Sequence, residues 1–188
     1  MLEDYRHFRN PNVGPRYHHF NLLGPLTNPA GATRQLIGAP SVEAAELMAQ
    51  ALAGLEPERA FVVHGSDGLD EVTTTGPTAV FEVTREKVIR TEWSPADFGV
   101  EQAQPCDLAG GDRAVNCGIA TAILHGQRGA QRDIVLINAA AALVAAGLTQ
   151  DLRDATQRAK ESVDSGAAWQ KVERLKSFTT TSKPETRN

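Results

Sequence analysis

A short apolar run in the first third of the chain places the strongest limit on its fold. Residues Arg59 to His64 have the sequence RAFVVH and are bounded by turn-forming residues. A run of this length, rich in branched and aromatic side chains, predicts a strand buried on both faces. Such a strand must be covered by other secondary structure, so neighbouring segments are expected to pack on it.

The segments around this strand alternate between helix and strand patterns. Ser41 is predicted to cap a helix running to about Leu55, and Asp112 a helix running to about Leu124. Two more strands, 78–82 and 87–93, are predicted around a turn at 84–86. Three more helices are predicted at 133–147, 152–165 and 167–175. This order predicts an α/β fold, with a central sheet and packed helices.

The 188 residues suit one domain with short appendages. Residues 1–19 are polar without clear periodicity, and we expect them to be poorly ordered. Residues 20–176 are expected to form the α/β domain. Residues 177–188 have little apolar content and are predicted to be a flexible tail.

Composition excludes several function classes. The chain has 19 Lys and Arg against 23 Asp and Glu, and this net charge of −4 does not favour nucleic-acid binding. The longest apolar run, Ile134 to Leu148, is shorter than the roughly 20 residues of a membrane span. Cys106 and Cys117 are the only cysteines, without the spacing of a zinc site or a disulfide scaffold. A cytoplasmic location is the simplest expectation.

A proline- and glycine-rich segment, Asn21 to Pro29 (NLLGPLTNP), is the first candidate for function. Each Pro fixes φ and the Gly frees it, so the segment takes a stiff, irregular path. Such a loop can present backbone groups to a flat ligand. Composition alone favours a structural turn into the next element.

The second candidate, His64 to Glu71 (HGSDGLDE), directly follows the predicted strand. Ligands of α/β sheets bind at the carboxyl ends of strands. Adjacent Asp70 and Glu71 offer hard oxygen ligands suited to Mg²⁺, which usually takes one or two carboxylates plus substrate phosphates. The alternative is a solvated acidic turn in which Asp67 is a turn or capping residue. His64 could act as an acid or base, but a hydrogen-bonded structural role is the more common one for such a residue.

Two weaker signals lie further along. Gly110 to Asp112 (GGD) could place backbone N–H groups near an anion, but a helix entry capped by Asp112 explains it equally well. Asn138 lies inside the Ala-rich helix, where a buried amide needs partners. We expect it to brace a neighbouring loop rather than to contact a ligand.

Several motifs taken together resemble the anthranilate phosphoribosyltransferase family. They are FNLLGPLTNPAG, RQLIG, VVHGSDGLDE, SPADFG, LAGGD, RDIVLINAAAAL and DSGAAWQKVERL, in this order between Phe20 and Leu175. The resemblance implies a phosphoribosyltransferase and nucleoside-phosphorylase-like α/β domain. It also implies an enzyme of tryptophan biosynthesis that joins anthranilate to phosphoribosyl diphosphate and releases diphosphate.

The same resemblance implies the site residues. Gly24 and Pro25 belong to the loop that lines the anthranilate channel, and Asp70 and Glu71 correspond to the acids that bind Mg²⁺ with the diphosphate. Magnesium offsets charge on the leaving group, and the protein mainly orients the amine against the sugar carbon. No residue is therefore expected to act as a catalytic nucleophile.

The chain also departs from the family pattern. The helical domain and the GTGGD-type phosphate loop of the family lie upstream of these motifs and are absent; Gly110 to Asp112 lies downstream of the acid pair and is not that loop. Neither Arg9 nor Arg16 aligns with the arginine that contacts anthranilate. We therefore expect a truncated form that is marginally stable, associates with itself, or needs a missing-half partner. The alternatives are a pyrimidine nucleoside phosphorylase-like enzyme and a non-catalytic fragment of the fold.

Overall fold

The structure is a computed structural model that describes residues 24–28 and 30–181. The predicted N-terminal segment 1–19, with Arg9 and Arg16, lies outside the described residues. So do residues 20–23 and Pro29 of the proline-rich segment, and residues 182–188 of the predicted tail.

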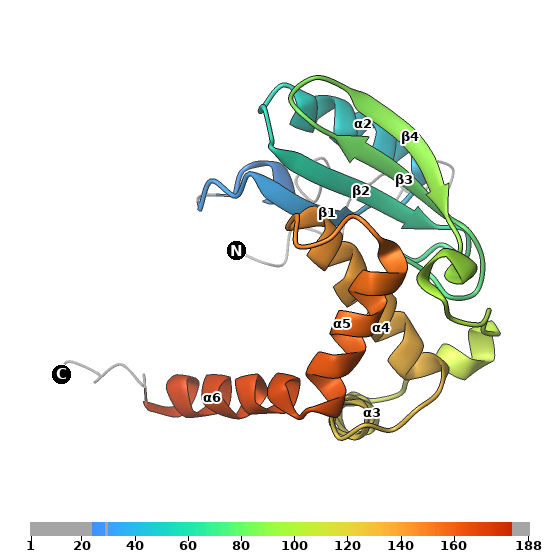
Figure 1. The fold of residues 1–188 in the computed structure, drawn as a ribbon, viewed down its shortest axis with the longest axis vertical. Coiled ribbons are helices and arrows are strands. Elements are labelled where there is room, and N and C mark those ends of the chain that lie inside the picture. The colour runs from blue at the N-terminus through green and yellow to red at the C-terminus, as the bar shows by residue number, and fades with distance from the viewer. Residues whose placement is uncertain (1–23, 29, 182–188) are drawn as a thin grey trace, which may run out of the picture.

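A four-stranded mixed sheet forms the centre of the fold (Figure 1). Its strands follow the order of the chain: β1 (Arg34–Gly38), β2 (Arg59–Gly65), β3 (Thr78–Val83) and β4 (Val88–Trp93). Strands β1 and β2 are parallel, whereas the pairs β2–β3 and β3–β4 are antiparallel. The expected α/β fold is confirmed.

Helices cover both faces of this sheet. The helices are α2 (Val42–Ala53), α3 (Arg113–Leu124), α4 (Ala130–Ala145), α5 (Leu152–Asp164) and α6 (Ala167–Thr181), with 3₁₀ turns η2 (Pro95–Phe98) and η3 (Pro105–Leu108). Helix α2 packs on one face, and the C-terminal half of α4 packs on the other with the start of α5. Figure 1 shows α3 at the far end of α4, and α6 extending away from the body of the molecule.

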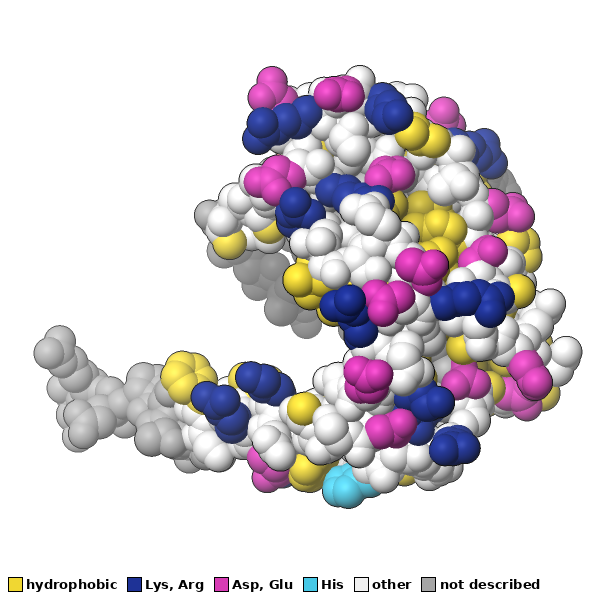
Figure 2. All heavy atoms as spheres, in the orientation of Figure 1, with side chains coloured by type: hydrophobic (Ala, Val, Ile, Leu, Met, Phe, Trp, Pro, Cys, Tyr) yellow, Lys and Arg dark blue, Asp and Glu magenta, His cyan; other side chains and the backbone are white. Residues whose placement is uncertain are grey.

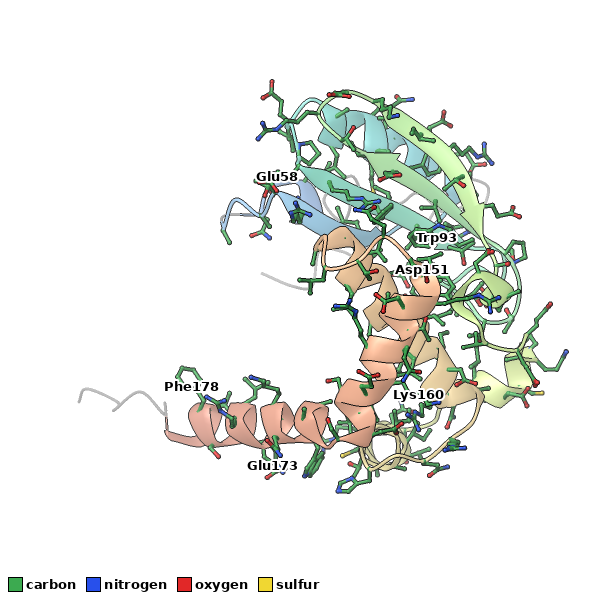
Figure 3. The ribbon with its side chains drawn as sticks, viewed as in Figure 1. Glu58, Trp93, Asp151, Lys160, Glu173 and Phe178 are labelled. Atoms are coloured by element: carbon green, nitrogen blue, oxygen red, sulfur yellow. The ribbon has the colours of Figure 1, made fainter. Side chains whose placement is uncertain are left out.

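Successive side chains of β2 point to opposite faces of the sheet and so contribute to two separate core clusters. Ala60 and Val62 face the cluster formed with α2, whereas Phe61 and Val63 face the cluster formed with α4. Trp93, labelled at the end of β4 in Figure 3, packs against Phe61 with the ring centroids 5.0 Å apart and the ring planes tilted by 58°. The strand is therefore buried on both faces, as the apolar run predicts.

Two arginines from the parallel strands hold the end of α4 on the sheet. Arg34 donates a hydrogen bond of 3.4 Å to the carbonyl of Ala145, and Arg59 donates one of 3.4 Å to that of Val144. These carbonyls lie in the last turn of α4, where cations interact favourably with the helix dipole. Each arginine also pairs with a carboxylate, of Glu58 and of Glu82 respectively.

Most predicted elements are confirmed, but two boundaries and one strand differ. Helix α4 begins at Ala130 rather than Asp133, because Gly129, with a φ of +131°, turns the chain into the helix earlier. Helix α6 passes the predicted tail boundary and ends at Thr181; the hydroxyls of Ser177 and Thr179 donate to carbonyls of their own helix, which accommodates these polar side chains in it. Strand β1 is not among the predicted elements: RQLIG begins with two polar residues and has neither an apolar run nor a clear alternation, and its pairing with β2 is a tertiary contact.

No helix among the described residues is long and apolar enough to span a membrane.

Helix α3 is rich in apolar residues but is mostly exposed. Its sequence is RAVNCGIATAIL, yet Ile123 is its only buried residue. The opposite face of the helix lies exposed within the part of the chain that the structure describes.

Candidate functional site

The parallel strands β1 and β2 end side by side and position the candidate site. Beyond the last residue of β1, the N–H of Ala39 donates to the carbonyl of Val63 at 2.9 Å. His64 Nδ1 lies 2.8 Å from the carbonyl oxygen of Ala39. His64 therefore ties the two strand ends together, which is the structural role expected for it. This is the edge of an α/β sheet at which ligands bind.

The acidic bend, residues 65–72, leaves the end of β2 in a tight turn. The N–H of Gly65 donates to the carbonyl of Leu69 at 2.8 Å, and the N–H of Gly68 donates to that of Gly65 at 2.9 Å. Gly68 has a φ of +92°, a conformation that favours glycine. The bend presents Asp70 and Glu71 as adjacent, exposed side chains.

The third carboxylate of the bend, that of Asp67, is directed back toward its own segment. Its Oδ2 accepts hydrogen bonds from the hydroxyls of Thr73 and Thr75, both at 2.6 Å, and its Oδ1 accepts one from the N–H of Leu69 at 3.2 Å. Partial burial acts to raise the pKa of Asp67, but these hydrogen bonds outweigh burial and lower it. Asp67 is a turn residue, whereas no described residue donates a hydrogen bond to the side chains of Asp70 and Glu71.

Glu71 has the opposite electrostatic setting. Partial burial raises its pKa, and the neighbouring carboxylates of Asp70 and Asp67 raise it further. The folded chain thus concentrates negative charge at the acid pair without a described cationic partner. A bound cation would relieve this repulsion.

Asn138 of α4 fixes the chain directly after the acid pair. Its Oδ1 accepts a hydrogen bond of 2.9 Å from the N–H of Val72, and its Nδ2 donates one of 2.7 Å to the carbonyl of the same residue. Nδ2 also donates to the carbonyl of Ile134 at 2.9 Å. The prediction that Asn138 braces a neighbouring loop is confirmed.

The proline-rich segment lies beside the end of β1. Residues Gly24 to Leu26 form a helical turn, and Leu26 packs against the cluster between α2 and the sheet. Gly24 and Pro25 line a hollow of about 520 Å³. Its other lining residues come from the same segment and from β1: Asn28, Gln35, Leu36, Ile37 and Gly38.

Gly38 joins the two candidate segments. It lines the hollow with Gly24 and Pro25, and a Cβ built on it would overlap the carbonyl oxygen of Asp70. The backbones of β1 and the acidic bend are therefore in direct contact. The side chains of Asp70 and Glu71 do not line this hollow, so the two segments adjoin without sharing one cavity.

Sequence reasoning missed three contributors to this arrangement. Gly38 ends the RQLIG motif, and Thr73 and Thr75 belong to the TTT run after the acid pair, but only the fold shows what they contact. The GGD segment is a helix entry, because the Asp112 carboxylate accepts from the N–H of Val115. Within the described residues, no group of three His, Cys, Asp or Glu is arranged to hold a metal, and both cysteines are free and exposed.

Comparison with known proteins places this arrangement in a family. Residues 18–169 match the family model described as "Glycosyl transferase family, a/b domain". The chain belongs to this family. The match includes the proline-rich segment, the acidic bend and Asn138, and ends within α6.

Two curated relatives have the same name. The anthranilate phosphoribosyltransferase of Solibacter usitatus is 62% identical over 159 residues, which are 85% of this chain and 47% of the relative. That of Azospirillum brasilense is 47% identical over 186 residues, covering 97% of this chain and 52% of the relative. The chain thus spans about half the length of the curated relatives it matches.

Solved structures agree with these sequence matches. The anthranilate phosphoribosyltransferase of Thermus thermophilus superposes with a TM-score of 0.78 at 38% identity, covering 88% of this chain and 48% of that one. The Saccharomyces cerevisiae enzyme in complex with PRPP and Mg gives 0.74 at 28% identity, covering 82% and 45%. Another structure of the yeast enzyme contains 4-fluoroanthranilate.

Proposed function

We propose that the chain forms part of the active site of an anthranilate phosphoribosyltransferase, which transfers phosphoribosyl from phosphoribosyl diphosphate to anthranilate. The contact of Gly38 with both candidate segments carries this proposal. This contact makes the proline-rich segment and the acid pair neighbours across one residue. The names and bound molecules of the relatives supply the substrates.

Asp70 and Glu71 would hold Mg²⁺. They fit it because they are adjacent, exposed and mutually repelling carboxylates, and Mg²⁺ is commonly bound by one or two carboxylates while phosphates and water complete its shell. A pair rather than a cage of three acids suits a cation that arrives with its diphosphate. When bound, the ion would offset the charge that develops on the departing diphosphate.

Gly24 and Pro25 would receive the aromatic amine. Pro25 restricts the backbone, and Leu26 anchors the turn to the core, so the wall of the hollow is stiff. A rigid wall can orient the amine toward the anomeric carbon of the sugar, and such orientation lowers the barrier without a covalent intermediate. The role proposed for these residues is therefore positioning.

The complete reaction would need more than this chain. Because the chain spans about half the length of its relatives, we expect little turnover from it alone. The remaining contacts to the substrates would come from the part of the relatives' length that this chain does not match. Product formation from anthranilate, phosphoribosyl diphosphate and Mg²⁺ would measure this, and turnover equal to that of a full-length relative would contradict the expectation.

A binding experiment tests the acid pair itself. The 188-residue chain is titrated with Mn²⁺, as a paramagnetic substitute for Mg²⁺, in the presence of diphosphate. Changing Asp70→Asn and Glu71→Gln together should abolish binding while the chain still melts cooperatively and no lower than the parent. The double variant Glu46→Gln with Glu92→Gln makes the same charge change at exposed positions on α2 and β4 and should bind normally. Equal binding by both double variants would refute the metal assignment.

A further inference from the structure

We propose that Asp67 is a positioning residue that holds the Asp70–Glu71 turn in the conformation that binds the cation. This inference rests on the proposed function, because it assigns the cation to Asp70 and Glu71. Asp67 itself would not be a ligand, since its carboxylate already accepts three hydrogen bonds from its own segment.

The hydrogen bonds of Asp67 close a loop around the acid pair. Asp67 precedes the pair by three residues, and the hydroxyls that it accepts from belong to Thr73 and Thr75, which follow the pair. One oxygen atom, Oδ2, receives both at 2.6 Å. The carboxylate therefore joins the two ends of the segment that carries the acids.

Packing fixes the position of this carboxylate. A Cβ on Gly65, the last residue of β2, would lie 2.6 Å from Oδ1 of Asp67 and 3.1 Å from the side chain of Thr73. Asp67 thus lies directly against the end of a central strand. Thr73 is 1% exposed, so water does not replace its hydrogen bond easily.

The far end of the bend is fixed independently by Asn138, which pairs with both backbone groups of Val72. Asp70 and Glu71 therefore lie on a short span that is held on both sides. Residues that orient the ligands of a metal typically contribute roughly 10- to 100-fold to its affinity. Asp67 takes this role for the acid pair by restricting the backbone that carries it.

The test must separate position from charge, because Asp67→Asn also removes a negative charge near the cation. Thr75→Val solves this problem, since it deletes one hydrogen bond to Asp67 and leaves every charge in place. Thr75→Ser keeps the hydroxyl. Asp97→Asn is the matched control: its carboxylate likewise accepts a backbone N–H and a hydroxyl, both from Ser94, at the start of η2.

Two measurements on the full chain decide the outcome. In the metal-free chain, Thr75→Val and Asp67→Asn should lower the ¹⁵N order parameters of residues 69–71. In Mn²⁺ titrations with diphosphate, both should weaken binding by about 10-fold, while Thr75→Ser and Asp97→Asn match the parent.

Unchanged order and unchanged Mn²⁺ affinity in Thr75→Val would overturn the positioning role. The proposed function fails separately, when the parent chain and the variant that lacks both Asp70 and Glu71 carboxylates bind Mn²⁺ alike. If Thr75→Val binds normally while that variant does not bind, the acids are ligands and Asp67 does not position them.

Discussion

The acidic bend has three carboxylates within five residues, and their different surroundings give them different roles. Asp67 accepts hydrogen bonds from two hydroxyls and a backbone N–H, which lower its pKa against the effect of burial. Glu71 has no such donors among the described residues, and burial with like charges raises its pKa. A carboxylate that accepts several hydrogen bonds stabilises the fold, whereas a carboxylate without donors is available to bind a ligand.

Glu71 should make the stability of the chain depend on pH. Its pKa in the folded state lies above the ordinary 4.5, so the folded state binds the proton more tightly than the unfolded state does. The associated stability is present below pH 4.5 and is lost as the pH rises through the folded-state pKa.

Glu71→Gln removes this ionisation. In chelator-treated samples we expect the variant to melt above the parent at pH 7, with the difference becoming small at about pH 3.5, where Glu71 is largely protonated in both states. Thermal melts from about pH 3.5 to about pH 7.5 measure the effect, with Glu46→Gln on α2 as the control. A variant that melts below the parent at pH 7 would contradict the prediction.

Asn138 should contribute to stability as well as to the geometry of the bend. Asn138→Leu leaves the buried N–H and C=O of Val72 without their partners, at an expected cost of about 2 kcal/mol. Chemical denaturation measures this loss.

Asn116 of α3 provides a close control because it pairs with both backbone groups of Gly111 in the same way, but Gly111 lies in an exposed loop. Water can replace those bonds, so Asn116→Leu should cost much less. Equal losses from the two substitutions would show that burial of Val72 is not the cause.

Among the elements, the contact between β1 and the acidic bend matters most. Strand β1 is short, and its last residue can approach the carbonyl of Asp70 only because it lacks a Cβ. The arginines of β1 and β2 hold the end of α4 on the same sheet. In this way the parallel pair connects the bend, the proline-rich segment and the helix that carries Asn138.

Gly38→Ala should therefore disturb the site and the fold together. The new methyl would overlap the carbonyl of Asp70 and force the backbones apart, with an expected loss of roughly 1–3 kcal/mol. Gly118→Ala is the control, because Gly118 lies inside α3 with no atom near a new Cβ. It should stabilise the chain by about 0.5–1 kcal/mol through helix propensity. A Gly38→Ala chain that melts like the parent would rule out the close contact.

At the scale of the whole molecule, the described chain leaves much apolar surface uncovered. Figure 2 shows α6 standing out from the body with hydrophobic atoms on its surface, and Figure 3 places Phe178 and Glu173 on opposite sides of this helix. Phe178 is 70% exposed, Leu175 61% and Val115 of α3 50%. Exposed apolar surface of this kind favours association.

We expect the sedimentation coefficient of the chain to rise with concentration. Leu175→Lys together with Phe178→Lys should reduce this dependence, because the two substitutions place charge on the apolar side of α6. Leu55→Lys is the control, since Leu55 is similarly exposed, at 58%, just beyond α2. A parent chain that sediments as a monomer at every concentration, with a cooperative melt, would contradict the expectation.

Local features of this protein could be predicted without coordinates. The spacing of apolar residues and the positions of capping residues predicted most helices and strands, because spacing along the chain decides which side chains share a face. The motif order predicted the family, and the spacing of the carboxylates marked the acidic bend. These features depend on neighbours in sequence.

Which separate segments meet depends on contacts between residues far apart in the chain. Strand β1 forms by pairing with β2, and its terminal glycine brings the proline-rich segment to the acidic bend. The fold also turned Asp67 toward Thr73 and Thr75 while leaving Asp70 and Glu71 exposed. The sequence predicts either a magnesium pair at Asp70 and Glu71 or an acidic turn in which Asp67 is the turn residue. Hydrogen bonding and burial, which depend on packing in three dimensions, give Asp67 a different setting from that of Glu71.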